Sequence, residues 1–142
     1  MANFCGLPYP ITKDSLGYFR SQCGPNTVKG DLLMLLLTNP GERVMMPDFG
    51  TGLRKLVFDP NDFIIKDRAK SMIIDAITAW EPRIAVEQID VYTGAEASES
   101  LSPSDDLTQA DNSLIVRIIF VEKDNINELQ ELILTVPLES NV

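Results

Sequence analysis

The spacing of apolar residues predicts that the first half of the chain is helical. In residues 62–80, apolar side chains recur at intervals of one, three and four positions, so they share one helical face. Polar and charged residues take the opposite face, and Pro82 ends the helix because proline cannot continue the hydrogen-bond ladder. The apolar face consists of Ile65, Ala69, Met72, Ile73, Ala76, Ile77 and Trp80.

Two other segments are predicted to be helical. The first begins at Asn26 or Thr27, either of which can cap a helix, and ends before Pro40. Its six consecutive apolar residues, 32–37, predict burial on nearly all sides, which is more than a small monomer usually needs. Residues 53–58 predict one amphipathic turn, ended by the Asp-Pro pair that follows.

The pattern becomes that of strands in the C-terminal half. Residues 84–92 alternate only in their second half, whereas 114–121 are apolar on both faces, as in a central or doubly covered strand. Residues 128–138 alternate cleanly, and 122–127 are predicted to form a loose hairpin connection. We therefore predict an α+β fold, with N-terminal helices packed on one face of a small, mostly antiparallel sheet formed by the C-terminal half.

The length of 142 residues favours a single domain with an extension. Residues 1–25, here called the arm, mix glycine, proline and aromatic residues and are predicted to be irregular. Residues 26–142 are predicted to form the domain, within which 94–112 carry five acidic and no basic residues and should be a mobile loop. The arm is expected to pack aromatic rings onto another surface, the candidates being Phe4, Tyr9, Tyr18 and Phe19.

Composition excludes several classes of function. The net charge is −9, and a surface this acidic would repel nucleic acid and anionic lipid, so neither is expected as a partner. The chain has no histidine, which removes Ser–His and Cys–His nucleophilic chemistry and most catalytic zinc sites, and we expect neither a cofactor nor a metal. Cys5 and Cys23 could form a bridge, but the sequence does not imply one, and a reducing compartment is the default.

Carboxylates are the first candidate for chemistry. Glu42, Asp48 and Glu81 lie beside predicted turns and could supply the two acids of a glycosidase. The alternative is structural, with Glu42 and Glu81 pairing with nearby arginines or accepting hydrogen bonds from backbone amides. Among 21 acidic residues, some adjacency arises by chance.

Three other segments each allow a structural and a functional interpretation. Residues 80–83 either terminate a helix with a weak surface ion pair or form a rigid recognition element for a partner. Residues 41–52 fit neither a P-loop nor a dinucleotide-binding motif, so a shaped structural turn is favoured. The strand at 129–136 is either an edge guarded by charge and proline or a docking edge for another chain.

Three short segments of the chain together resemble a known family. The sequence TNPGERVMMPDFG at 38–50, the FDP at 58–60 and the WEPR at 80–83 resemble the baseplate-wedge and sheath-initiator proteins of contractile phage tails, the GPW family. Related proteins occur in contractile bacteriocins and in the type VI secretion baseplate, and the same family has been labelled lysozyme-like. The resemblance covers roughly residues 26–138.

The resemblance implies structural work in the tail baseplate of the virion, after assembly in the host cytoplasm, and no catalysis. It implies binding to the helical core bundle of the larger wedge subunits, and initiation of the tail sheath by strand exchange with the first sheath ring. Tube or hub proteins are further expected neighbours, with several copies of the chain around a six-fold baseplate. A peptidoglycan-degrading glycosidase, or a type VI secretion or bacteriocin baseplate subunit, is the alternative.

Carried onto this sequence, the resemblance gives three sets of residues. The wedge-binding set is Trp80, Glu81, Pro82 and Arg83. The structural turn consists of Gly41, Glu42, Arg43, Pro47, Phe49 and Gly50. The strand expected to dock the sheath contains Leu129, Glu131, Ile133, Leu134 and Thr135. Burial against partners would also explain the leucine-rich run at 32–37.

Overall fold

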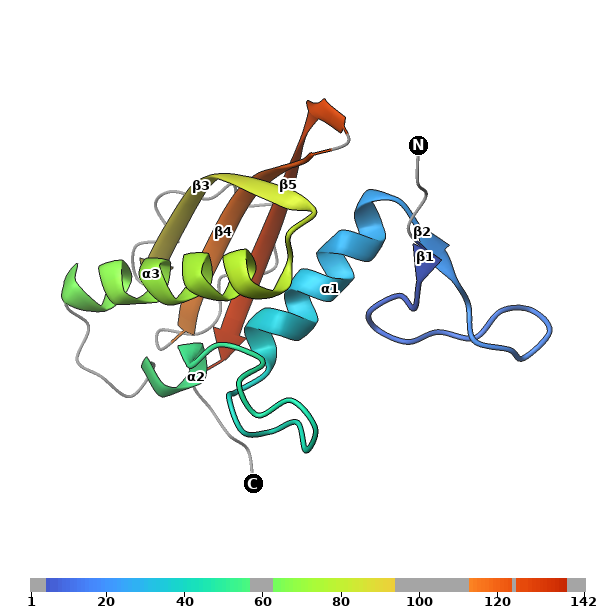
Figure 1. Cartoon of the computed structure of the whole chain (residues 1–142), viewed down its shortest axis with the longest axis horizontal. Coiled ribbons are helices and arrows are strands. Elements are labelled where there is room, and N and C mark those ends of the chain that lie inside the picture. The colour runs from blue at the N-terminus through green and yellow to red at the C-terminus, as the bar shows by residue number, and fades with distance from the viewer. Residues whose placement is uncertain (1–4, 57–62, 94–112, 124, 138–142) are drawn as a thin grey trace.

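A computed structural model describes residues 5–56, 63–93, 113–123 and 125–137. The predicted acidic loop at 94–112 and the FDP segment at 58–60 lie outside the described residues. Two helices and a sheet form the body of the molecule, and the arm extends from one end of it (Figure 1). The elements in chain order are β1 (Cys5–Gly6), β2 (Gln22–Cys23), α1 (Pro25–Leu37), α2 (Leu53–Leu56), α3 (Phe63–Trp80), β3 (Ile84–Thr93), β4 (Ser113–Glu122) and β5 (Asn125–Pro137).

The C-terminal half forms a three-stranded antiparallel sheet in the order β3-β4-β5, which confirms the predicted α+β class. β4 is the central strand, as its apolar run predicts. The weak alternation in the first half of β3 has a local cause, since the register shifts between Val86 and Gln88. The predicted hairpin between β4 and β5 is confirmed, but its connection is shorter than the predicted 122–127, because β5 already begins at Asn125 and pairs there with Glu122.

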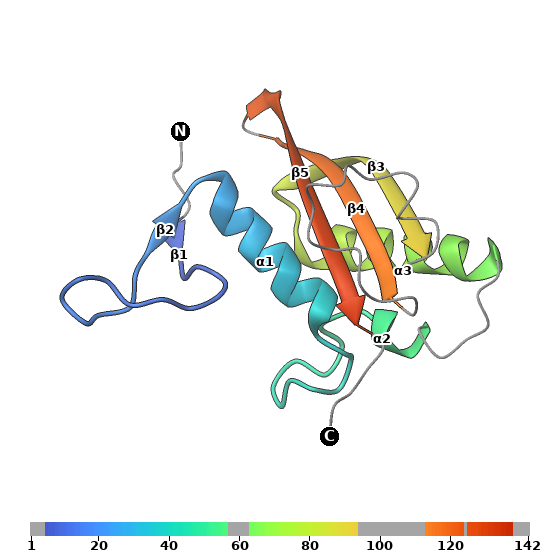
Figure 2. The same ribbon diagram turned by 180° about the vertical axis from the view of Figure 1, so that it is seen from behind.

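The helices α1 and α3 lie on the same face of the sheet, and the two opposite views agree on this (Figures 1 and 2). The predicted apolar face of α3 is confirmed, since Ala69, Ile73 and Ile77 are buried against the sheet. From β4, alternate residues including Val116, Ile118 and Phe120 complete this core, and Ile118 and Phe120 have no exposed surface. Sequence periodicity therefore identified the main helix–sheet interface.

The structure corrects two expectations about α1. Gly24 is the N-cap residue and Pro25 occupies the first turn, whereas the Thr27 hydroxyl donates to the Gln22 carbonyl at 2.7 Å. Proline suits this position because its missing N–H would have no partner in the helix. The leucine-rich run is buried by the chain itself, since α1 packs on α2, α3 and β5. Only Met34 of residues 32–37 is exposed, so burial against partners is not needed to explain the run.

The arm is more ordered than its composition predicts. β1 pairs with β2 in antiparallel register, and a disulfide joins Cys5 to Cys23, which settles a question that the sequence left open. The loop between these strands projects beyond the N-terminal end of α1, away from the sheet (Figures 1 and 2). Tyr18 and Phe19 are 72% and 69% exposed, so nothing in the described chain covers them.

Candidate partner-binding site

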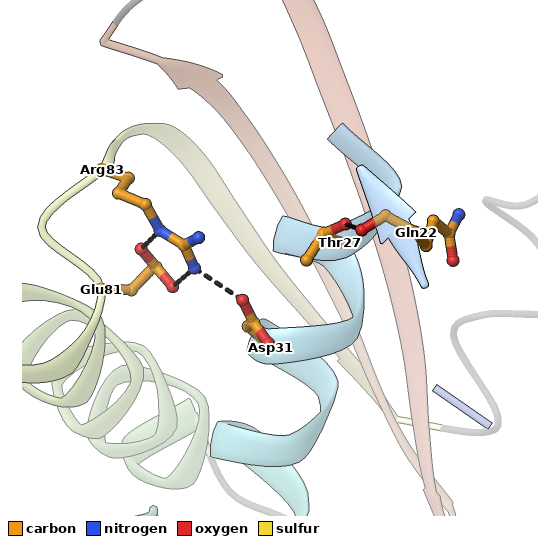
Figure 3. A network of polar contacts seen from close by, with 5 residues as sticks. All are labelled: Gln22, Thr27, Asp31, Glu81 and Arg83. Atoms are coloured by element: carbon orange, nitrogen blue, oxygen red, sulfur yellow. Dashed lines mark hydrogen bonds and ion pairs between the residues drawn. The ribbon is translucent and has the colours of Figure 1, made fainter. Parts of the chain in front are cut away.

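The wedge-binding residues predicted from sequence lie where α3 turns into β3. The helix ends with the Glu81 N–H donating to the Ile77 carbonyl at 2.8 Å, and Pro82 then directs the chain into the sheet. The Arg83 guanidinium donates from Nε to Oε1 and from Nη2 to Oε2 of Glu81, both at 2.5 Å (Figure 3). This planar two-point contact fixes both side chains relative to one another.

A third residue, Asp31 of α1, completes the network. Its Oδ2 accepts a hydrogen bond from Arg83 Nη2 at 2.6 Å, which links the turn after α3 to the middle of α1 (Figure 3). Sequence reasoning missed Asp31. A signal was available, because Asp31 is the sole acidic residue of α1 and directly precedes its leucine-rich run.

Burial makes this network more than the surface ion pair that the sequence allowed. The Glu81 side chain is 7% exposed and that of Arg83 is 26% exposed. Hydrogen bonding to Glu81 is the main cause that raises the pKa of Arg83, so the guanidinium stays charged. A buried carboxylate needs such a partner, because removing it would leave an uncompensated charge away from water.

The turn motif folds back on the end of α1. The carboxylate of Glu42 accepts hydrogen bonds from the backbone N–H of Asn39 at 3.0 Å and from its side-chain amide at 2.8 Å. These two bonds lower the pKa of Glu42. Across the turn, the Gly41 N–H donates to the Pro47 carbonyl at 2.7 Å. The segment is thus held by its own hydrogen bonds, as the structural interpretation of its sequence predicts.

Gly50 and Thr51 attach the end of the turn to α1. The Thr51 N–H donates to the Thr38 carbonyl and its hydroxyl to the Leu36 carbonyl, both at 2.8 Å. Gly50 has a φ of 111°, and a Cβ there would lie 2.2 Å from the Thr38 oxygen. Only glycine fits this backbone, so the second glycine of the motif has a steric reason.

Aromatic contacts join the two motifs. The guanidinium carbon of Arg43 lies 3.8 Å from the centre of the Phe49 ring. Phe49 in turn meets Trp80 edge to face, with ring centroids 5.3 Å apart. A cation over an aromatic face and an edge-to-face ring pair are both favourable arrangements. The GER segment and the EPR segment, nearly forty residues apart in sequence, therefore form one site.

This site surrounds a hollow of about 470 Å³. The arm forms one wall, α1 another, and the turn motif and the end of α3 the rest. The residues that line the hollow include Leu7, Tyr9, Ile11, Asp31, Met34, Arg43, Phe49, Trp80, Glu81 and Arg83. Apolar and charged side chains thus face the same space, as is typical of a recognition surface.

Glu42 and Glu81, two of the three carboxylates considered for a glycosidase, are engaged in hydrogen bonds. A general acid must hold a proton, which requires a raised pKa, yet the pKa of Glu42 is lowered by Asn39. Both oxygens of Glu81 are engaged by Arg83.

No group of three or more His, Cys, Asp or Glu side chains suited to a metal ion occurs within the described residues. The helices that the structure describes include none that is long and apolar enough to cross a membrane.

The predicted sheath-docking residues lie on β5, an edge of the three-stranded sheet. Leu129 is 68% exposed, and Glu131 pairs with Arg117 of the neighbouring strand at 2.5 Å. Ile133 and Thr135 are half-buried on the sheet face that Glu131 shares, the face away from the helices. Leu134 points into the core, so only its backbone is available at the edge.

The fold and the site together define a small α+β protein with a buried polar network, an aromatic contact and, among the described residues, β5 as an edge strand of its sheet. Residues 24–120 match the family model described as baseplate wedge protein gp25. The chain belongs to this family of structural proteins of contractile tail baseplates, and its location is the tail baseplate of the virion.

One relative shows how far the likeness extends in sequence. The baseplate wedge protein gp25 of Enterobacteria phage T4 is 30% identical over 112 residues, which cover 77% of this chain and 72% of the phage protein. This covers most of both chains, so the family assignment does not depend on the two short motifs alone.

Two solved structures share the fold. A crystal structure of a candidate tail lysozyme from Geobacter sulfurreducens superposes with a TM-score of 0.62 at 24% identity, over 82% of this chain and 92% of the other. The cryo-EM structure of the anti-feeding prophage baseplate contains a chain with a TM-score of 0.60 at 15% identity, over 98% of this chain and 89% of that one. At these identities the likeness concerns the fold.

Proposed function

We propose that this chain binds the helical core bundle of the larger baseplate wedge subunits through the site around Arg83, and that it starts the tail sheath by accepting a strand from the first sheath ring. In this role it is a structural subunit and not an enzyme. It is present in several copies around a six-fold baseplate, with tube or hub proteins as further neighbours.

The observation that carries the wedge-binding half is the network of Glu81, Arg83 and Asp31. Two segments far apart in sequence, α1 and the turn between α3 and β3, hold one guanidinium in a fixed place at the rim of a hollow, and its side chain remains 26% exposed. Fixing the side chain in the free protein means that little conformational entropy is lost when a partner binds. Arginine and tryptophan are also the residue types that dominate binding energy at interfaces.

A double variant tests this half. Arg83→Ala alone leaves the buried Glu81 carboxylate without its partner and risks unfolding the protein, so Glu81→Gln is added to remove that charge. The double variant is expected to stay folded by circular dichroism and to bind the purified larger wedge subunit at least about tenfold more weakly, as loss of an interface anchor does.

The control is the double variant Arg117→Ala and Glu131→Gln, which removes a more exposed ion pair from the face of the sheet that lies away from the helices. It should bind the wedge subunit as the unmodified chain does. A folded Glu81/Arg83 variant with undiminished binding would show that the wedge subunit docks elsewhere.

The sheath-docking half is supported by the position of β5 at the sheet edge. An edge strand presents backbone donors and acceptors that another strand can pair with, and the exposed Leu129 offers an apolar contact beside them. The ion pair between Arg117 and Glu131 adds charge to the sheet face on which Ile133 and Thr135 lie half-buried.

Sheath growth on assembled baseplates, observed by electron microscopy, tests this half. Backbone N–H groups of successive residues point to opposite sides of an antiparallel strand. One of the two variants Ile133→Pro and Leu134→Pro therefore removes an N–H on the free edge of β5. The other removes a hydrogen bond between β5 and β4. The folded edge variant should prevent sheath growth, and Gln88→Pro on the opposite edge should not. Leu129→Lys, which adds a charge at an exposed position, should weaken sheath attachment without affecting the core. Normal sheaths on both the folded proline variant and Leu129→Lys would refute β5 as the docking strand.

A further inference from the structure

The arm contributes to the same hollow as Glu81 and Arg83, although sequence reasoning assigned it no role. Leu7, Tyr9 and Ile11 line one side of the hollow, facing Met34 and the aromatic pair of Phe49 and Trp80. They come from the part of the arm that lies beside α1 (Figure 1).

Two features hold this part of the arm in place. The disulfide Cys5–Cys23 and the short β1–β2 pairing close its base next to the first turn of α1. Further along, Tyr9 packs directly against Gly30, where a Cβ would lie 3.3 Å from the Tyr9 backbone nitrogen. A larger residue at position 30 would displace the arm, so close packing at this glycine positions the wall of the hollow.

The arm nevertheless leaves large apolar side chains in water. Leu7 is 53% exposed and Ile11 61% exposed, and Met34 beside them is 40% exposed. Contiguous apolar surface of this kind on a soluble chain usually marks an interaction site. Because these three side chains border the hollow, an occupant of the hollow would cover them.

The rest of the lining specifies the chemistry of the occupant. Asp31 uses one carboxylate oxygen for Arg83 and remains 44% exposed, so it can accept a further hydrogen bond from a cation. Arg43 already covers the face of Phe49. The occupant therefore needs an apolar ridge for the arm and α1, with a lysine or arginine beside that ridge. An amphipathic helix has this arrangement, with apolar residues at intervals of three and four and polar residues next to them.

We propose that the arm is the second half of the wedge-binding site, and that an amphipathic helix of the larger wedge subunit lies in the hollow. Its apolar ridge contacts Leu7, Ile11 and Met34, and one of its basic residues pairs with Asp31. This inference rests on the proposed function, since it names the partner surface that the Arg83 site receives.

The arm itself provides a matched pair of variants. Ile11 borders the hollow, whereas Leu16, which is 79% exposed, lies in a separate turn. That turn is held by Asp14, whose carboxylate accepts the backbone N–H groups of Leu16 and Tyr18 at 2.9 Å. Both side chains are aliphatic and largely in water, so changing either to serine should leave the fold intact.

Affinity for the purified larger wedge subunit is measured by titration. Ile11→Ser is expected to weaken binding about tenfold, the loss of one buried aliphatic side chain, and Leu16→Ser less than about twofold. If Ile11→Ser has no effect while the Glu81/Arg83 double variant weakens binding, the arm inference is wrong and the proposed function stands. If Ile11→Ser acts and the Glu81/Arg83 variant does not, both are wrong as stated. Equal losses for Ile11→Ser and Leu16→Ser would also overturn the assignment to the hollow.

A photo-crosslinking residue introduced at position 11 identifies the occupant in assembled baseplates. A product with the larger wedge subunit, mapped to a helical segment, supports the inference. A product with a second copy of this chain or with the sheath protein would overturn it. The same residue at position 16 is the control, and it should give little product with the wedge helix.

Discussion

Replacing Gly50 by alanine should disconnect the turn motif from α1. Gly41 and Gly50 lie in the same turn and both have positive φ, 93° and 111°, so alanine at either site incurs the same kind of backbone cost, about 1–2 kcal/mol. They differ in their surroundings. A Cβ at Gly41 meets nothing within 4 Å, whereas one at Gly50 lies 2.2 Å from the Thr38 oxygen and 2.8 Å from its carbonyl carbon.

A Cβ at position 50 would force the turn away from Thr38 and break two hydrogen bonds. The turn must move away from Thr38 by about 1 Å to restore an ordinary contact, and this movement breaks the bond from the Thr51 N–H to the Thr38 carbonyl. The buried bond from the Thr51 hydroxyl to the Leu36 carbonyl is lost with it. Each loss costs about 1 kcal/mol or more, so Gly50→Ala should lower the free energy of unfolding by about 3–5 kcal/mol in total.

Urea unfolding followed by the fluorescence of Trp80 measures this difference, since Trp80 is the single tryptophan of the chain and contacts Phe49 in the turn. With a slope of about 2 kcal/mol per molar urea, Gly50→Ala should lower the midpoint by about 2 M and Gly41→Ala by at most about 1 M. If the two variants differ by less than about 0.5 kcal/mol, the steric account of the second glycine is wrong.

Two further predictions concern the same turn. Hydrogen bonds from Asn39 lower the pKa of Glu42 in the folded state, so their contribution to stability is present above the unfolded value of 4.5 and is lost as the pH falls through the folded value. The difference in melting temperature between the unmodified chain and Glu42→Gln should therefore shrink from pH 7 to pH 3, and a difference that is constant with pH would contradict this assignment. Thr51→Val should lower the free energy of unfolding by about 1–3 kcal/mol because the buried Leu36 carbonyl loses its donor, while Thr51→Ser, which keeps the hydroxyl, should lower it less.

Sequence reasoning predicted correctly those elements in which one pattern of apolar residues extends over a whole helix or strand. The buried face of α3 follows from the periodicity of residues 62–80, and the central position of β4 follows from the apolar run at 114–121. The structure also brings the two family motifs together, since Phe49 of one motif contacts Trp80 of the other.

The missed features all depend on neighbours that are distant in sequence. A strand of two residues such as β1 has no periodicity, so neither its pairing with β2 nor the Cys5–Cys23 bridge could be deduced from the sequence. Asp31 becomes part of the site only because α1 passes beside the end of α3, 52 residues later. The leucine run at 32–37 was assigned to partners because its burial against α2, α3 and β5 is a property of the folded chain.

The backbone of Arg83 adds a mechanical property to the site. Its carbonyl accepts a hydrogen bond from the N–H of Lys123, at the turn that joins β4 to β5, with a distance of 2.9 Å. The backbone of Arg83 is thus hydrogen-bonded to the turn between β4 and the edge strand β5. This bond continues the β3–β4 ladder, whose first pair is Ile84 and Glu122, so the ladder and the bond together link Arg83 to the hairpin. Under the proposed function, a force applied at the edge strand β5 would therefore be transmitted through the sheet to the site around Arg83.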